Sequence, residues 1–215
     1  MSGTDWGRVA MLIAAVVPAV ILHEVSHGVV ALWFGDDTAK RAGRLTLNPI
    51  PHVDPFGTLL LPLLLSLAGP GAFGYAKPVP VNPRNLRNPR QHSLYVSLAG
   101  PATNLSLALL AAVVLRSVFL DDLRRVFFVD DLPLLPQLVF WFGLVNVLLA
   151  VFNALPIPPL DGSALVERVL PRSWWPGWLK FRQWGFLVLL LLVFWTDLLP
   201  KIFDPFVERW LDLLA

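Results

Sequence analysis

The stretch Ile21–Gly28, which reads ILHEVSHG, places two histidines and a glutamate inside an apolar run. Residues four apart lie on one face of a helix, so His23 and His27 can present their imidazoles to a single metal ion, with Glu24 beside them as a candidate general base. Residues 9–20 and 28–34 are apolar, which gives this helix the length and hydropathy of a membrane span. Ionisable side chains are costly in hydrocarbon, and such a cluster therefore indicates a functional site.

The composition is that of a polytopic membrane protein. Of the 215 residues, 56% are hydrophobic and only 15% are charged, whereas soluble domains have about 25% charged residues. The formal net charge of +2 is small and the basic residues cluster in short loops, so the expected partner is the lipid bilayer and not nucleic acid. The chain has no cysteine, so any metal must be held by histidine and carboxylate ligands.

We expect an all-α polytopic membrane protein with a core of three transmembrane helices that carry the metal site. Core helices are expected at 6–34, 93–115 and 137–155, and a further apolar helix at 181–199 precedes an amphipathic tail. Segments 44–48 and 76–82 have the alternation or the proline pattern of edge strands, which predicts a small membrane-associated β-sheet. The apolar run within 54–70 is short for a span and is interpreted as re-entrant.

The number of crossings decides which side of the membrane the site faces. If segment 54–70 is re-entrant, the helix that carries His27 and the helix that precedes Asp161 end on the same side. That side then collects most of the lysines and arginines of the loops, so the positive-inside rule places it toward the cytoplasm. The alternative is that 54–70 crosses the membrane completely and the ends are rearranged.

Asp161 is the candidate for a third metal ligand. It follows a proline-broken helix end and precedes Gly162, so its carboxylate can point at a neighbouring helix. Two histidines, one carboxylate and an open fourth position make a catalytic zinc geometry with room for a water molecule. The alternative is that Asp161 caps a helix that starts near Gly162.

Three separated motifs resemble those of the site-2 protease family of intramembrane zinc metalloproteases. They are HEVSH at 23–27, AGPATN at 99–104 and the run from NALP to LDG at 153–162, in the order and spacing of the family. The resemblance covers roughly residues 7–170, and segments 52–57 and 76–83 look like its compact prokaryotic branch. It predicts one metalloprotease domain over 1–215, with 171–215 as an additional helix and tail, and without the PDZ or CBS modules that some members append.

The resemblance implies that one zinc ion is bound by His23, His27 and Asp161. It also implies that Glu24 is the catalytic base, which takes a proton from water and returns it to the leaving amine.

Three further residues are candidates for contacts with the substrate or the transition state. The resemblance assigns this role to Asn153 and, more weakly, to Asn104 as a polar group between core helices, and His52 could assist from a loop next to the site. From the residues alone, His52 can also be a loop histidine at the membrane surface. Asn153 can likewise form an ordinary hydrogen bond between helices.

The implied function is regulated intramembrane proteolysis in a prokaryotic cell membrane. The expected substrates are proteins with a transmembrane helix, such as a membrane-held anti-sigma factor, and no oligomeric state is predicted. Two alternatives are a metal-binding membrane protein without hydrolysis and a scaffold that binds transmembrane helices. Neither alternative requires Glu24.

Overall fold

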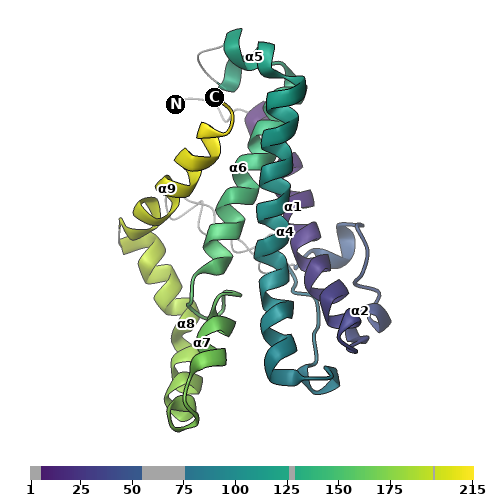
Figure 1. Cartoon of the computed structure of the whole chain (residues 1–215), viewed down its shortest axis with the longest axis vertical. Coiled ribbons are helices and arrows are strands. Elements are labelled where there is room, and N and C mark those ends of the chain that lie inside the picture. Colours follow the sequence, from purple (N-terminus) through teal and green to yellow (C-terminus); the bar gives the residue numbers. More distant parts are fainter. Residues whose placement is uncertain (1–5, 55–75, 126–128, 196) are drawn as a thin grey trace.

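The structure is a computed structural model that describes residues 6–54, 76–125, 129–195 and 197–215. Every regular element in these residues is helical (Figure 1). Three helices are long and apolar enough to cross a membrane, namely α1 (Trp6–Trp33), α4 (Pro89–Val118) and α6 (Leu134–Ala154). The predicted core of three spans is therefore confirmed.

Shorter helices connect and flank these spans. They are α2 (Thr38–Arg41), η1 (Ile50–His52), η3 (Pro83–Asn85), α5 (Leu120–Arg125), η4 (Val129–Asp131), α7 (Ser163–Val169) and η5 (Arg172–Trp174). Helix α4 begins four residues earlier than predicted because Asn88 caps it: the Asn88 side chain accepts a hydrogen bond from the backbone N–H of Gln91, and Pro89 occupies the first turn.

Small residues allow the three spans to approach closely. Each of α1, α4 and α6 contacts the other two, and the buried positions include Ala19 on α1, Gly100 and Ala108 on α4, and Gly143 on α6. Lipid tails are as apolar as leucine, so association of spans depends on such close packing and on buried hydrogen bonds.

The C-terminal region adds α8 (Trp175–Trp195) and α9 (Leu198–Asp212). The two helices meet at a bend of 75° and can be counted together as a fourth, broken span. Helix α9 is the predicted amphipathic tail, and its Trp210 side chain is buried against Gly143, where it donates a hydrogen bond to the carbonyl of Ala108 at 2.8 Å.

The predicted β-sheet is wrong, because neither 44–48 nor 76–82 forms a strand in the structure. The backbone donors of 76–82 are already used elsewhere: Lys77 N–H donates to the carbonyl of His52, Val79 N–H to Glu24 and Asn82 N–H to Asp36. Prolines at positions between them have no N–H to donate. An extended segment held by side chains in this way cannot form a regular ladder.

The end of α1 and the start of α4 lie together at one end of the bundle (Figure 1). The carbonyl of Phe34 accepts a hydrogen bond from the N–H of Arg87 at 3.0 Å, and the buried Asp36 accepts from Thr38, Asn82 and Asn85. These contacts agree with the topology in which α1 and α6 end on the same side. Residues 55–75, which contain nearly all of the segment interpreted as re-entrant, lie outside the described residues.

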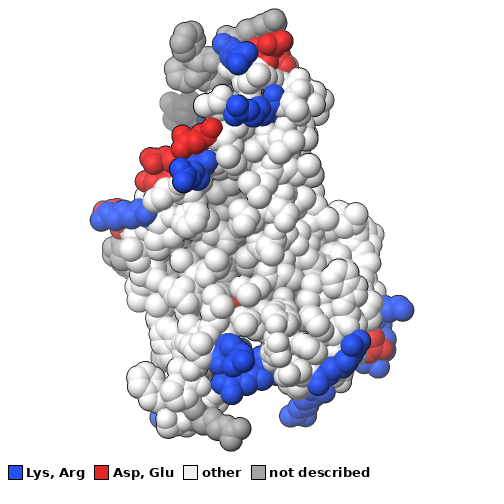
Figure 2. Space-filling view, viewed as in Figure 1, with Lys and Arg blue, Asp and Glu red and all other residues white. Residues whose placement is uncertain are grey.

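Charged side chains are scarce across the middle of the face seen in Figure 2. They gather toward the two ends of the molecule and along α9, with lysine and arginine prevailing at the end where α2, α7 and the start of α4 lie (Figures 1 and 2). This is the distribution expected of helices that cross a bilayer.

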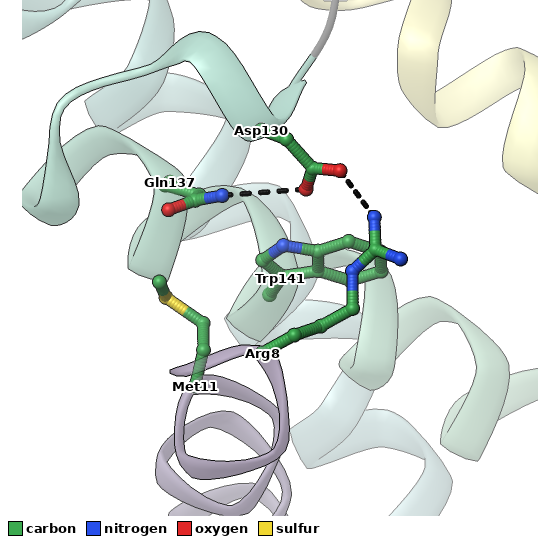
Figure 3. Close-up of a pocket in the computed structure, with 5 residues that line it drawn as sticks. All are labelled: Arg8, Met11, Asp130, Gln137 and Trp141. Carbon is green, nitrogen blue, oxygen red and sulfur yellow. Dashed lines mark hydrogen bonds and ion pairs between the residues drawn. The ribbon is translucent and has the colours of Figure 1, made fainter. Parts of the chain in front are cut away.

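At the other end, the first turns of α1 are tied to η4 and α6 (Figure 3). Arg8 forms an ion pair with Asp130, which also accepts a hydrogen bond from Gln137 at 3.4 Å. With Met11 and Trp141 these residues line a pocket of about 390 Å³. The pocket lies between α1, η4 and α6, at the end of the bundle away from His23 and His27.

Candidate metal centre

His23, His27 and Asp161 bring three potential ligand atoms together. His23 Nε2 lies 3.1 Å from His27 Nε2 and 3.1 Å from Asp161 Oδ2, and His27 Nε2 lies 3.3 Å from the same oxygen. Both histidines are buried. Among the described residues, this is the one group of three or more His, Asp or Glu side chains whose geometry could hold a metal ion.

These separations fit a small tetrahedral ion. With metal–ligand distances of about 2.0–2.1 Å, neighbouring ligands of a tetrahedral zinc site are about 3.3–3.4 Å apart. Asp161 Oδ2 is buried and makes no regular hydrogen bond. The polar atoms near it are the two imidazole nitrogens, so a cation bound among the three groups would offset the cost of burying the carboxylate. The residues present therefore fit zinc.

Gly100 on α4 leaves the space that an ion would need. A Cβ atom at this position would lie 2.5 Å from His23 Nε2 and 2.6 Å from His27 Nε2. Any side chain would therefore compete with a metal for the space beside the two nitrogens.

Asp161 reaches α1 because the chain folds back at the end of α6. The N–H of Gly162 donates to the carbonyl of Asn153 at 2.7 Å, and a Cβ on Gly162 would lie 2.1 Å from the carbonyl oxygen of Ala154. Only glycine permits this close approach. Helix α7 starts at Ser163 with Gly162 as its N-cap residue and no side-chain cap, so the Asp161 carboxylate faces the histidines and does not cap the helix.

Glu24 lies beside the cluster and is held by the extended segment 76–82. Its Oε2 accepts a hydrogen bond from the backbone N–H of Val79 at 2.8 Å. Because Pro78 and Pro80 have no N–H, Val79 supplies the only backbone donor of these three residues. The carboxylate is thereby positioned next to the candidate metal ligands.

Each imidazole has a hydrogen-bond partner on the side away from the cluster. His27 Nδ1 lies 2.6 Å from the carbonyl oxygen of Val96, and His23 Nδ1 lies 2.5 Å from Asn104 Oδ1. Both partners are on α4. Such contacts orient ligand rings and fix which nitrogen is free to bind metal. The structure thus places Asn104 behind His23, where it contacts a candidate ligand.

The other two candidates occupy different places. Asn153 lines the cleft next to the cluster, and its Nδ2 donates to the carbonyl of Leu149 at 3.1 Å. His52 is buried in η1, where its Nε2 lies 2.9 Å from the carbonyl oxygen of Thr46. The structure does not bring His52 into the metal cluster or the cleft wall.

The cluster opens into a cleft of about 1290 Å³ between the spans, segment 76–83 and α8. Most of its lining is apolar, including Val16, Val20, Leu148, Phe152, Phe186 and Leu189. His23, Glu24, His27 and Asp161 are grouped on its wall. A cleft of this kind suits an apolar polypeptide segment with its scissile bond presented to a few polar groups.

Sequence reasoning missed several groups that complete the site. The backbone N–H of Val79 and the carbonyl of Val96 give no signal in residue identity. Asn146, whose side chain contacts Asn104, could have been found as an isolated polar residue in an apolar span. Gly100 lies in the AGPATN motif at 99–104, but the motif did not indicate that this glycine borders the two histidines.

Comparisons with known proteins agree with this site. Residues 132–195, which include Asn153 and Asp161, match the model of peptidase family M50. The chain is 39% identical over 203 residues to the Bacillus subtilis protein named "Putative zinc metalloprotease YwhC", covering 94% of this chain and 87% of that one. It is 34% identical to "Putative zinc metalloprotease Rip2" of Mycolicibacterium smegmatis, covering 95% and 71%.

A more distant relative is archaeal. "Putative zinc metalloprotease MJ0611" of Methanocaldococcus jannaschii is 29% identical over 158 residues, covering 71% of this chain and 67% of that one. No solved structure gives a significant match. The ligand cluster, the adjacent glutamate and these relatives lead to one conclusion: the chain belongs to peptidase family M50, the site-2 protease family.

Proposed function

We propose that this protein is a zinc-dependent intramembrane endopeptidase, formed by residues 1–215 as a single domain, that hydrolyses peptide bonds within or near transmembrane helices of other proteins. The observation that carries the proposal is the convergence of His23, His27 and Asp161 beside Glu24 inside a membrane-spanning bundle. The relatives' names, which read "Putative zinc metalloprotease", support zinc as the metal.

The depth of the cluster supports cleavage within the membrane. Trp33, the last residue of α1, follows His23 by ten residues, which is about 15 Å along the helix axis. The 28 residues of α1 are about 42 Å long. Centring this helix on a hydrocarbon core about 30 Å thick places His23 about 10 Å below the surface. The apolar lining of the cleft is suited to a substrate segment that is itself embedded in lipid.

The mechanism follows from the residues at the end of the cleft. His23, His27 and Asp161 would hold the zinc ion, which when bound makes water more acidic and polarises a peptide carbonyl. Glu24 takes a proton from the attacking water as the new C–O bond forms. It then gives this proton to the nitrogen of the leaving amine as the C–N bond breaks. Val79 keeps the carboxylate in place through its N–H, and the Asn153 side chain on the cleft wall is suited to bind the substrate backbone.

The proposed orientation has the site toward the cytoplasm. The end of the bundle that carries α2, α7 and the start of α4 is rich in lysine and arginine (Figure 2). Helix α1 ends at this side, ten residues after His23. By the positive-inside rule this is the cytoplasmic end.

The experiment is cleavage of a single-span test substrate by purified protein in detergent, compared between the native chain and Glu24→Gln. Bound zinc is measured in both. The proposal expects equal zinc, cleavage by the native protein and a loss of at least about 100-fold in the variant, since proton transfer contributes about 10²–10⁴-fold. Zinc binding by both proteins without cleavage of any substrate in a panel would instead favour a metal-binding protein or scaffold.

A further inference from the structure

Two asparagines are completely buried at the centre of the bundle. Asn104 on α4 and Asn146 on α6 each have 0% exposed surface, among side chains that are otherwise apolar. A buried amide without partners is costly, so residues of this kind are retained only where every polar atom is satisfied. Their hydrogen bonds form a continuous chain that ends at a metal ligand.

The chain begins at a backbone carbonyl of α6. Asn146 Nδ2 donates to the carbonyl of Phe142 at 2.8 Å. Asn146 Oδ1 accepts from Asn104 Nδ2 at 2.7 Å, and the same Nδ2 lies 3.3 Å from the carbonyl of Ala19. Asn104 Oδ1 then faces His23 Nδ1 at 2.5 Å.

Two backbone carbonyls fix the direction of this chain. The carbonyls of Phe142 and Ala19 can only accept hydrogen bonds, so an amide NH₂ group must face each of them. Reversing either amide would oppose two oxygens. Asn104 therefore presents its oxygen to His23 Nδ1, which must carry a proton, so Nε2, which faces Asp161, is the nitrogen that a metal would bind.

The two histidines differ in how firmly the partner of their Nδ1 atom is fixed. His27 Nδ1 is paired with the backbone carbonyl of Val96, which cannot be reversed. His23 Nδ1 is paired with a side-chain amide, whose oxygen and nitrogen can exchange places by a rotation of 180°. The carbonyl of Ala19 lies at the long distance of 3.3 Å, so the closer contact with Asn146 is the stronger restraint on this rotation.

We propose that Asn146 is a positioning residue for the metal centre: it holds the Asn104 amide in one orientation and so fixes the tautomer and ring orientation of His23. This inference rests on the metal site of the proposed function. It assigns a role to a residue that belongs neither to the ligand cluster nor to the residues that line the cleft.

The test uses the near-isosteric Asn146→Leu in the full chain. Zinc affinity is measured by competition with a chelator, and the His23 tautomer is followed by ¹⁵N NMR of histidine-labelled, metal-free protein. Replacing residues that orient metal ligands typically costs 10–100-fold in affinity. We expect a loss of about 10-fold or more, together with a mixture of the two neutral tautomers at His23 and an unchanged His27.

The matched control is Trp210→Phe. It removes another buried hydrogen bond between helices, the one to the carbonyl of Ala108, without contact to the cluster. Both variants are expected to lower thermal stability, and only Asn146→Leu is expected to change zinc affinity and the His23 signals.

A second comparison asks whether Asn146 acts through Asn104. In the background Asn104→Leu, the substitution of Asn146 should have little further effect on zinc affinity, because the chain of hydrogen bonds to His23 is already broken. Equal zinc affinity in Asn146→Leu and Trp210→Phe, with an unchanged His23 tautomer, would overturn the inference. If the native protein binds zinc and shows these effects but cleaves nothing, the proposed function fails while this inference stands.

Discussion

Gly100→Ala is the most informative single substitution at the metal centre. The added Cβ would lie 2.4 Å from His23 Cε1, 2.5 Å from His23 Nε2 and 2.6 Å from His27 Nε2. Non-bonded carbon atoms are normally about 3.5–4.0 Å apart, so the rings or α4 must shift by about 1 Å. Metal sites tolerate deviations of only about 0.2 Å in ligand distances.

The expected cost falls mainly on metal binding. Substitutions behind a ligand already cost about 10–100-fold in affinity, and a shift of two ligand rings should exceed about 100-fold on the same scale. Overpacking should also lower the free energy of unfolding by about 1–3 kcal/mol. Zinc content after dialysis and cleavage of the test substrate are measured in parallel with thermal unfolding.

The matched control is Gly177→Ala on α8, where an added Cβ meets no heavy atom within 4 Å. This variant should keep full zinc binding and gain up to about 1 kcal/mol in stability from helix propensity. If Gly100→Ala also keeps full zinc content and activity, the assignment of the metal to the space beside Gly100 is refuted.

Two further predictions concern the hydrogen bonds that Glu24 and Asp36 accept from residues 79–85. Val79→Pro removes the N–H that holds Glu24. Because a hydrogen bond to a charged group is worth about 1.5–3 kcal/mol, kcat should fall about 10-fold or more with zinc content unchanged. The control Val79→Ala keeps the N–H and should stay near native turnover. Burial alone would raise the pKa of Asp36, but hydrogen bonds from Thr38, Asn82 and Asn85 hold it below its ordinary value of 3.8. The ionised Asp36 carboxylate therefore stabilises the fold above pH 3.8, and this contribution is lost as the pH falls through the lowered pKa. Asp36→Asn should be less stable than the native protein at neutral pH and should lose less of its remaining stability below pH 3.8. Thermal unfolding across pH measures both effects. Equal turnover of the two Val79 variants, or parallel pH profiles for Asp36→Asn and the native protein, would contradict these predictions.

Much of the helical core could be predicted because hydropathy and length are local properties of the sequence. The first span was expected at 6–34 and is observed at Trp6–Trp33. Whether 76–82 forms a β-strand could not be predicted from local sequence. Its backbone N–H groups donate to Glu24, Asp36 and a loop carbonyl, and these acceptors lie far away in the sequence. The proline pattern of 76–82 correctly predicted an extended segment and wrongly predicted a strand.

The candidate metal ligands could be predicted from residue chemistry and motif order, and the structure brings His23, His27 and Asp161 together. Their supporting groups were harder to find. Val79 and Val96 act through backbone atoms, which every residue possesses. Asn104 was expected at the substrate, but only the three-dimensional arrangement shows that it faces His23.

The central claim is tested most directly by mapping the cleavage site in a single-span substrate by mass spectrometry, with the reaction run in H₂¹⁸O. We predict zinc-dependent products cut within the transmembrane segment or next to it. The new carboxyl terminus should carry ¹⁸O, and these products should be missing with Glu24→Gln. Products confined to the soluble flanks of the substrate, or the same products from the zinc-loaded Glu24→Gln variant, would contradict the claim.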